Sequence, residues 1–266
     1  MSNTGLYVYA IIPAEGLSTT QLPQGINDQS LYLVESNGLA AIVHESAPEP
    51  YQGPDADVQR WILEHSDVVD AAWQHLGTIL PVTFNVIVAP GDDAEHQPVQ
   101  RLQAWLAKSA DMMRAHLDKL RDHVELRVNI SLDEDTATAN DPELAKLRDG
   151  IDTRPAGVQR LYRKRLAERT RKAADRMADE LYPRIRKRLI ALAEDMVESP
   201  RLQREPGSVT VLNASLLVHR DVVDAIGVEL ADIRDNQPGA QIRYLGPWPP
   251  YSFGELPEVD NDPTSA

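Results

Sequence analysis

The stretch that constrains the fold most is Gly246-Pro247-Trp248-Pro249-Pro250-Tyr251-Ser252-Phe253. It combines three prolines with three aromatic residues, in a chain that is only 5% aromatic. Proline fixes φ, lacks an amide hydrogen and pushes the preceding residue toward extended geometry. The segment therefore cannot be a helix or a central strand. We predict a stiff, extended strip whose rings either close a core or face a partner.

The composition of the whole chain is that of an ordinary globular protein, with 42% hydrophobic and 26% charged residues among 266. The absence of cysteine excludes disulfides, thiol nucleophiles and Cys-ligated zinc, so a reducing cytoplasm is the expected compartment. The first residues lack the basic segment of a signal peptide. No apolar run approaches the ~20 residues that span a bilayer, so we expect no membrane span.

Charge is distributed unevenly along the chain. The formal net charge is −14, which argues against a nucleic-acid binder, because phosphate binding needs clustered positive charge. Val158–Glu205 nevertheless holds 14 Lys/Arg against 8 Asp/Glu, a local balance of +6 that leaves −20 for the other residues. This asymmetry points to one basic surface in an acidic protein.

Alternating and helical periodicities define the elements of the first half. A helix over about Val58–Leu76 places Ile62 and His65 on its buried line, and Asn37-Gly38 favours a tight hairpin turn. A second helix is expected over about Gln97–Arg121. The predicted strands are Leu6–Ile12, Leu31–Glu35, Leu39–Glu45, Thr78–Val88 and Val124–Leu132.

The second half begins with a long helical region over about Ala156–Glu198, whose apolar line starts with Val158 and Leu161. Pro183 interrupts this region, so we expect a kink or two consecutive helices. A strand, a helix and a last strand follow, over Val209–Val218, Asp221–Arg234 and Gln241–Leu245.

The irregular order of strands and helices favours an α+β fold over a doubly wound parallel sheet. We predict two small domains, each a mainly antiparallel, ferredoxin-like sheet with two helices on one face. The N-terminal domain spans 1–132, and the C-terminal domain spans 156–254 and opens with the long basic helical region. The polar, turn-rich residues 133–155 are the expected linker, and the acidic residues 255–266 a disordered tail.

No pattern indicates catalysis, a cofactor or a metal. The phosphate-binding patterns G-x-x-x-x-G-K-[ST] and G-x-G-x-x-G are absent, as are the G-x-S-x-G elbow and the H-E-x-x-H pair. Asp133-Glu134-Asp135 resembles the start of a calcium loop but lacks its later glycine and glutamate, so linker is the better interpretation. His65 is expected to be a hydrogen-bonded, partly buried histidine. We therefore expect a protein that is not an enzyme.

Two segments are candidate partner-binding surfaces. The basic helical region is either a solvated helix face or a docking face for an acidic partner, which includes the acidic part of this same chain. The strip either closes a core or presents aromatic rings to an apolar partner. The candidate contact residues are Arg163, Arg165, Arg169 and Arg176 on the helix and Trp248, Pro249, Pro250, Tyr251 and Phe253 on the strip.

The strip, together with the β-α-β pattern before it, resembles the C-terminal signature of the GvpF/GvpL family of gas vesicle accessory proteins. The resemblance continues through most of the chain. Its other segments are Gly5–Tyr9, Leu39–Val43, His65, Leu80–Phe84, Glu125–Val128 and Leu212–Val218. Thr83 and Asn85-Val86-Ile87 depart from the pattern of many members, which leaves open whether the chain is of GvpF or GvpL type.

The resemblance implies a non-enzymatic accessory protein of gas vesicle formation. Its implied partners are the small, very hydrophobic shell protein GvpA and other accessory proteins, and the protein is either an assembly factor or a minor vesicle component. Its expected location is the cytoplasm, in association with gas vesicles. The alternative is a nucleotide- or RNA-binding enzyme domain on a ferredoxin-like sheet, although RNA binding would place aromatics on the strands.

Overall fold

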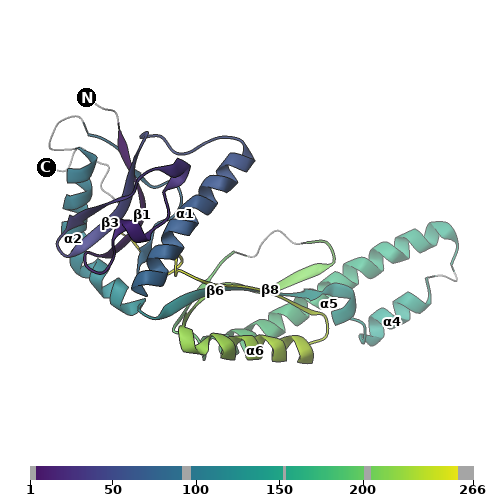
Figure 1. The fold of residues 1–266 in the computed structure, drawn as a ribbon. Coiled ribbons are helices and arrows are strands. Elements are labelled where there is room, and N and C mark those ends of the chain that lie inside the picture. The colour runs from purple at the N-terminus through teal and green to yellow at the C-terminus, as the bar shows by residue number, and fades with distance from the viewer. Residues whose placement is uncertain (1–3, 92–96, 152–153, 201–204, 257–266) are drawn as a thin grey trace. The chain divides into compact units, whose positions relative to one another are not determined.

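The computed structural model describes residues 4–91, 97–151, 154–200 and 205–256, and Figure 1 shows its mixture of helices and strands. The chain forms two compact units. The N-terminal unit consists of Met1–Val124 and Trp248–Ala266, and the C-terminal unit of Glu125–Pro247. Each unit contains one sheet with helices packed on it, so the predicted α+β class is confirmed.

The sheet of the N-terminal unit has the order β2-β3-β1-β4, with β5 also paired to β1. Its long strands are β1 (Gly5–Pro13), β2 (Tyr32–Ser36) and β3 (Leu39–Ser46), and β1 runs antiparallel to β3. The predicted hairpin joins β2 to β3 through Asn37 and Gly38, whose φ angles are 51° and 76°. Two successive positive φ angles are typical of the primed turns that match strand twist.

Helices α1 (Asp55–Leu76) and α2 (Pro98–Lys119) cover the two opposite faces of this sheet. Tyr7 of β1 bonds to His65 of α1, whereas its neighbour Val8 lines a groove with Leu102 of α2. Because successive strand residues point to opposite faces, the sheet lies between the helices. The expectation of both helices on one face is therefore wrong for this unit, and β1 is buried from Gly5 to Ile12.

The predicted strand Thr78–Val88 is two short strands, β4 (Leu80–Pro81) and β5 (Ile87–Val88). Asn85 lies between them with a φ of 73°, which breaks the extended run. Its side chain accepts a hydrogen bond from the Tyr51 amide at 2.8 Å and donates one to the Tyr51 carbonyl at 3.1 Å. These two bonds stabilise the turn and explain why the apolar run does not continue as one strand.

The C-terminal unit has the ferredoxin-like order of elements, β-α-β-β-α-β. Its strands are β6 (His123–Asp133), β7 (Asp195–Glu198), β8 (Ser208–His219) and β9 (Ala240–Trp248), in the sheet order β7-β8-β6-β9. The helices of the motif are α5 (Ala156–Ile190) and α6 (Val223–Asn236). Arg188 of α5 bonds to Glu229 and Asp232 of α6, so the two helices are neighbours.

Helix α5 departs from part of the prediction. Pro183 lies inside one continuous helix, so the alternative of two consecutive helices is wrong, and the helix ends at Ile190 rather than near Glu198. The residues from Asp195 to Glu198 instead form β7, an edge strand paired to β8. Two of its four residues are acidic, so the sequence has no apolar alternation here that would predict a strand. An exposed edge tolerates such residues because charge there opposes unwanted pairing.

The boundary between the units also differs from the predicted one. β6 belongs to the second sheet, and the expected linker 133–155 contains α3 (Glu134–Ala137) and α4 (Pro142–Asp149). Leu144 and Ile151 are buried in this segment. The chain then returns to the N-terminal unit at Trp248. Most of the predicted tail, 257–266, lies outside the described residues.

Candidate functional site

The aromatic-proline strip begins at the end of the edge strand β9 and continues into the N-terminal unit. Pro249, Pro250 and Phe253 are buried, and Phe253 is only 8% exposed. The Phe253 amide donates to the Pro250 carbonyl at 3.1 Å, which folds the end of the strip into a turn. This part of the strip thus packs as core, whereas Trp248 is 37% exposed.

Tyr251 lines an apolar groove of about 320 Å³ on the α2 side of the N-terminal sheet. One side of the groove comes from the segment that runs from β4 to β5 and includes Pro81, Val86 and Val88. The other side comes from α2, with Leu102 and Trp105. The other lining residues are Val8, Val82, Thr83, Gly254 and Leu256. Nearly all of these side chains are apolar, so the groove suits an apolar segment rather than a charged metabolite.

The sequence indicated only one side of this groove. Contact with an apolar partner was one of the two interpretations of the strip, and Tyr251 is its member at the groove. Leu102 and Trp105 are more than 140 positions earlier in the chain and gave no such signal. Leu102 belongs to the buried face of α2, and only the packed unit shows that part of this helix borders an open groove.

A buried network of tyrosines and histidines lies on the other face of the sheet, between β1 and α1. Tyr7 Oη lies 2.9 Å from His65 Nδ1, and Tyr9 Oη lies 2.9 Å from His44 Nδ1. His44 Nε2 lies 3.1 Å from Tyr51 Oη. His44 and His65 are 0% and 2% exposed, so the prediction of a hydrogen-bonded His65 is confirmed.

The backbone determines the direction of these hydrogen bonds. Tyr7 Oη accepts the Asn85 amide at 3.1 Å, so its own O–H is left to donate to His65 Nδ1. His65 Nε2 then donates to the Val82 carbonyl, 3.0 Å away. Burial lowers the pKa of His65 to about 4, so the ring is neutral at pH 7. Both ring nitrogens are occupied, which indicates a structural ring rather than a proton-transfer group.

The second histidine follows the same pattern. Tyr9 Oη accepts the Ile26 amide at 2.8 Å and therefore donates to His44 Nδ1. His44 Nε2 is left to donate to Tyr51. Burial lowers the pKa of His44 to about 4 and raises the pKa of Tyr9 above its usual range. The network is thus a neutral polar core.

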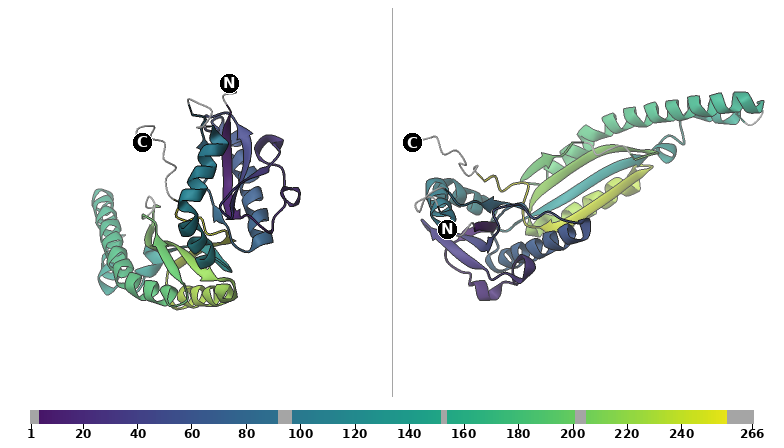
Figure 2. Two further views of the ribbon diagram at one scale, coloured as in Figure 1. Left: turned by 90° about the vertical axis from the view of Figure 1, so that its left-hand side faces the viewer. Right: turned by 90° about the horizontal axis from the view of Figure 1, so that it is seen from above.

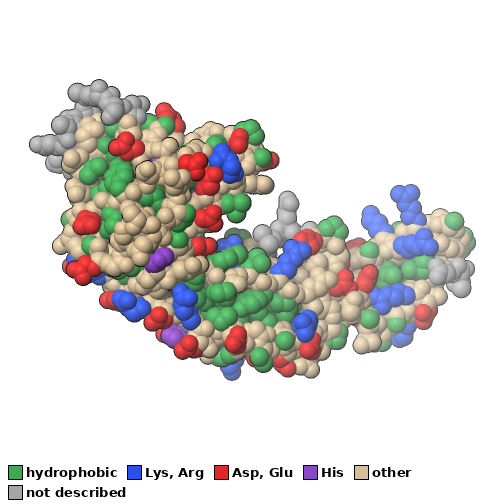
Figure 3. Space-filling model, in the orientation of Figure 1, with side chains coloured by type: hydrophobic (Ala, Val, Ile, Leu, Met, Phe, Trp, Pro, Cys, Tyr) green, Lys and Arg blue, Asp and Glu red, His purple; other side chains and the backbone are tan. Residues whose placement is uncertain are grey.

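The candidate arginines Arg163, Arg165, Arg169 and Arg176 are all exposed on α5. Residues 156–169 contain no buried position, because this part of the helix runs past the end of the strands, as Figure 2 shows. Arg154 stacks on Tyr162, with its guanidinium carbon 3.9 Å from the ring centroid. We call α4 and residues 156–169 of α5 the arm. Figure 3 shows Lys and Arg side chains gathered at the end of the C-terminal unit that contains the arm.

Three positions on predicted apolar lines are exposed instead of buried. Ile62 on α1 is 41% exposed, and Val158 and Leu161 on the arm are 38% and 65% exposed. The periodicity of a helix shows which residues share a face but not whether that face meets another element. The candidate residues of the strip, Trp248–Phe253, belong to the N-terminal unit, and the candidate arginines belong to the C-terminal unit.

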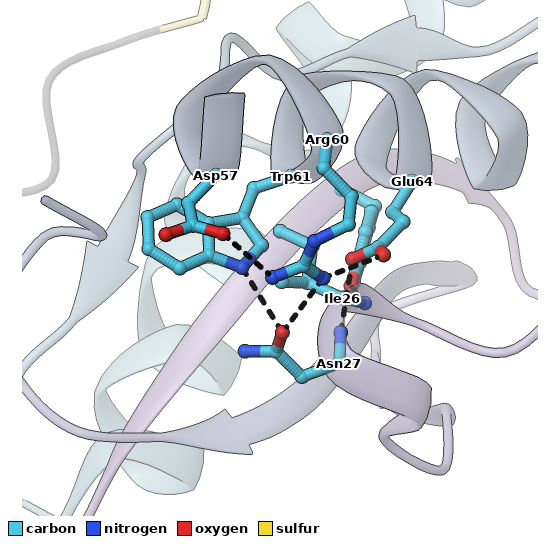
Figure 4. A network of polar contacts seen from close by, with 7 residues as sticks. Ile26, Asn27, Asp57, Arg60, Trp61 and Glu64 are labelled. Carbon is cyan, nitrogen blue, oxygen red and sulfur yellow. Dashed lines mark hydrogen bonds and ion pairs between the residues drawn. The ribbon is translucent and has the colours of Figure 1, made fainter. Parts of the chain in front are cut away.

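A polar network ties α1 to the loop before β2, as Figure 4 shows. Arg60 donates to Asn27 Oδ1 at 3.0 Å and to Glu64 Oε1 at 2.8 Å, and it lies 3.7 Å from Asp57. Trp61 Nε1 also donates to Asn27 Oδ1, at 3.0 Å. Asn27 adopts a left-handed φ of 55°, a conformation that asparagine tolerates better than most residues.

Two kinds of feature are absent from the described residues. None of the described helices combines the length and the hydropathy that crossing a membrane requires. Among the same residues, no three His, Cys, Asp or Glu side chains gather closely enough to hold a metal ion.

Comparison with known proteins gives consistent matches. The family described as "Gas vesicle synthesis protein GvpL/GvpF" matches residues 5–255. Gas vesicle protein L1 of Halobacterium salinarum is 31% identical over 264 residues, which cover 94% of this chain and 90% of that protein. Gas vesicle protein L of a Streptomyces species is 30% identical over 271 residues, which cover 96% and 94%. Gas vesicle protein F2 of H. salinarum is 22% identical, with coverages of 96% and 94%.

The fold has a match among solved structures. The crystal structure of GvpF from Anabaena aligns with a TM-score of 0.69 and 19% identity, covering 96% of this chain and 100% of that one. This likeness confirms the two-unit α+β architecture.

Proposed function

Because the chain belongs to the GvpL/GvpF family of gas vesicle synthesis proteins, we propose that it is an assembly factor that binds the hydrophobic shell protein of the vesicle. Family membership gives an accessory role in gas vesicles. Binding of the shell protein, other accessory proteins as partners, and a cytoplasmic location in association with vesicles are parts of the proposal. The higher identities to L proteins than to the F2 protein favour a GvpL-type member.

The observation that carries the proposal is the apolar groove in an acidic unit. The N-terminal unit holds 6 Lys/Arg and 20 Asp/Glu, so it carries the whole net charge of −14. The C-terminal unit has 21 of each and is neutral. An apolar shell segment would aggregate in water if it stayed exposed. A groove that covers such a segment, on a unit whose charge repels other complexes, would keep the shell protein dispersed.

The test is a pull-down of shell subunit by the full chain and by variants of the groove. Thr83 is an exposed residue of the groove lining, so Thr83→Trp should fill the groove with a large, mainly apolar ring. We expect the apparent affinity for shell subunit to fall by about tenfold, which corresponds to about 1.4 kcal/mol. Trp248→Ala, outside the groove lining, should have a smaller effect.

The matched control is Thr20→Trp, which places the same ring at an exposed position of the N-terminal unit away from the groove lining. It should bind shell subunit as wild type does. Unchanged binding by Thr83→Trp, with folding verified by circular dichroism, would remove the groove from the interface. Equal losses in both tryptophan variants would show a nonspecific effect of the added ring.

A further inference from the structure

Two helix surfaces of this chain each expose two neighbouring apolar side chains, and the two helices are opposite in charge. One lies on the arm, where Val158 and Leu161 are 38% and 65% exposed. The other lies on α1, where Ile62 and Leu63 are 41% and 64% exposed. Large apolar side chains at that exposure, beside charged groups, are typical of surfaces that contact a partner. Neither pair belongs to the apolar groove.

The arm surface is basic. Val158, Leu161, Arg165 and Arg169 follow one another at spacings of three and four residues, so they form one stripe along the helix. The whole of α5 holds 12 Lys/Arg and 4 Asp/Glu, and one of those acids, Glu168, is paired with Lys172 at 2.8 Å. The stripe therefore offers two apolar side chains followed by two cations, on a helix whose local charge is strongly positive.

The α1 surface is acidic. Leu63 is followed four residues later by the exposed Asp67, and α1 holds five Asp/Glu against the single cation Arg60. Figure 4 shows that Arg60 points toward Asn27, Asp57 and Glu64. The one cation of the helix is thus neutralised within its own network and offers little repulsion to an incoming basic helix.

We propose that the arm of one copy binds α1 of a second copy, with Leu161 and Val158 against Leu63 and Ile62 and with Arg165 and Arg169 facing the carboxylates of α1. Both surfaces are present on every chain at equal concentration. The contact joins two different patches, so it is heterologous and adds copies head to tail. A contact between two short helix segments is small, which predicts weak association that depends on salt.

The experiment is sedimentation velocity of the full chain over a range of concentrations at two salt levels. At about 0.1 M salt, where the screening length is roughly 10 Å, the average mass should rise with protein concentration. At about 1 M salt, where that length is roughly 3 Å, the chain should sediment as a monomer. Monomer mass at every concentration and at both salt levels would overturn the proposal. So would a salt-dependent change of sedimentation with no change of mass, because that indicates contact within one chain.

Two variants each remove one surface. Leu161→Ser with Arg165→Glu alters the arm, and Leu63→Ser with Asp67→Asn alters α1. Each variant alone should stay monomeric, whereas an equimolar mixture should form 1:1 dimers and nothing larger, because one intact arm meets one intact α1. Growth of the mixture beyond dimers, or its failure to dimerise, would contradict the head-to-tail arrangement.

The matched control is Val228→Ser with Arg184→Glu, which likewise replaces one aliphatic residue by serine and one arginine by glutamate, at exposed sites of the C-terminal unit outside the arm. It carries the same net charge as the arm variant and should associate as wild type does. Loss of association in this control would show that overall charge, and not the arm, is responsible. All substituted positions are exposed, and circular dichroism should confirm that each variant is folded.

Discussion

Acidification should weaken the N-terminal unit through its two buried histidines. Burial lowers the pKa values of His44 and His65 to about 4, whereas an unfolded histidine titrates near 6.5. Because the folded pKa lies below the unfolded one, the unfolded state binds protons first as the pH falls. The contribution of each ring to stability is therefore complete above about pH 6.5 and is lost progressively toward pH 4.

The size of the effect follows from the two pKa values. A full pKa unit of difference is worth about 1.36 kcal/mol, so at pH 5 each histidine lowers the free energy of unfolding by about 2 kcal/mol. The pair should therefore lower it by about 4 kcal/mol, which is a large part of the 5–15 kcal/mol that is typical of a domain. As the pH falls toward 5, the slope of the free energy of unfolding against pH should approach a value that corresponds to two protons per molecule. Both rings are buried, so solvent screening reduces the effect little.

Tryptophan fluorescence reports the unfolding of the N-terminal unit alone. The four tryptophans of the chain are Trp61, Trp73, Trp105 and Trp248, and all belong to the N-terminal unit. Denaturant unfolding followed by fluorescence between pH 7 and pH 5 therefore reports the unit that holds the histidines. The free energy of unfolding from each curve, plotted against pH, gives the proton slope.

His65→Gln removes one titrating ring and should reduce the slope by about one proton, besides lowering stability at pH 7. His75→Gln, which changes an exposed histidine of the same helix, should keep the wild-type slope. A free energy of unfolding that stays constant between pH 6.5 and pH 5 would contradict the lowered pKa values of the two histidines. An unaltered slope in His65→Gln would equally contradict them.

Three substitutions test the packing of the two units. Phe253→Ala should lower the stability of the N-terminal unit by about 3–4 kcal/mol in the fluorescence assay, and a loss under about 1 kcal/mol would show that the ring is not core. Gly239 has a φ of +79°, and a Cβ there would lie 2.8 Å from the Ala137 nitrogen. Gly239→Ala should therefore destabilise the C-terminal unit by about 1–3 kcal/mol in thermal melts followed by circular dichroism, and a wild-type melt would contradict this. Arg188→Met removes the ion pair with Glu229, which is partly exposed, so circular dichroism should show a loss of only about 1 kcal/mol that shrinks with salt; a salt-independent loss would indicate packing instead.

Local rules in the sequence predicted most of the elements. The alternation in β6, the Asn37-Gly38 turn and the helical rhythm of α1 and α2 all depend on residues within a few positions of each other. The strand β7 was not predicted, because its four residues show no pattern that is typical of a strand. Its place comes from pairing with β8, where Met196 lies opposite Leu216.

The candidate surfaces were predicted less completely than the elements. The candidate arginines are exposed as a docking face requires, but the strip is divided between core, groove and surface. Pro249, Pro250 and Phe253 are buried by neighbours that the strip itself does not specify. Val158 and Leu161 obey the helical rhythm and yet remain exposed, because α5 is longer than the sheet it crosses.

The class of fold, the family resemblance and the uneven distribution of charge are thus properties of the sequence alone. Which apolar faces are covered, where the groove opens and how the histidines are held depend on packing within each unit. The difference lies in the range of the interactions. Periodicity and turn geometry act over three or four residues, whereas the bond from the Asn85 amide to Tyr7 Oη joins residues 78 positions apart. Such contacts form only when the whole unit packs.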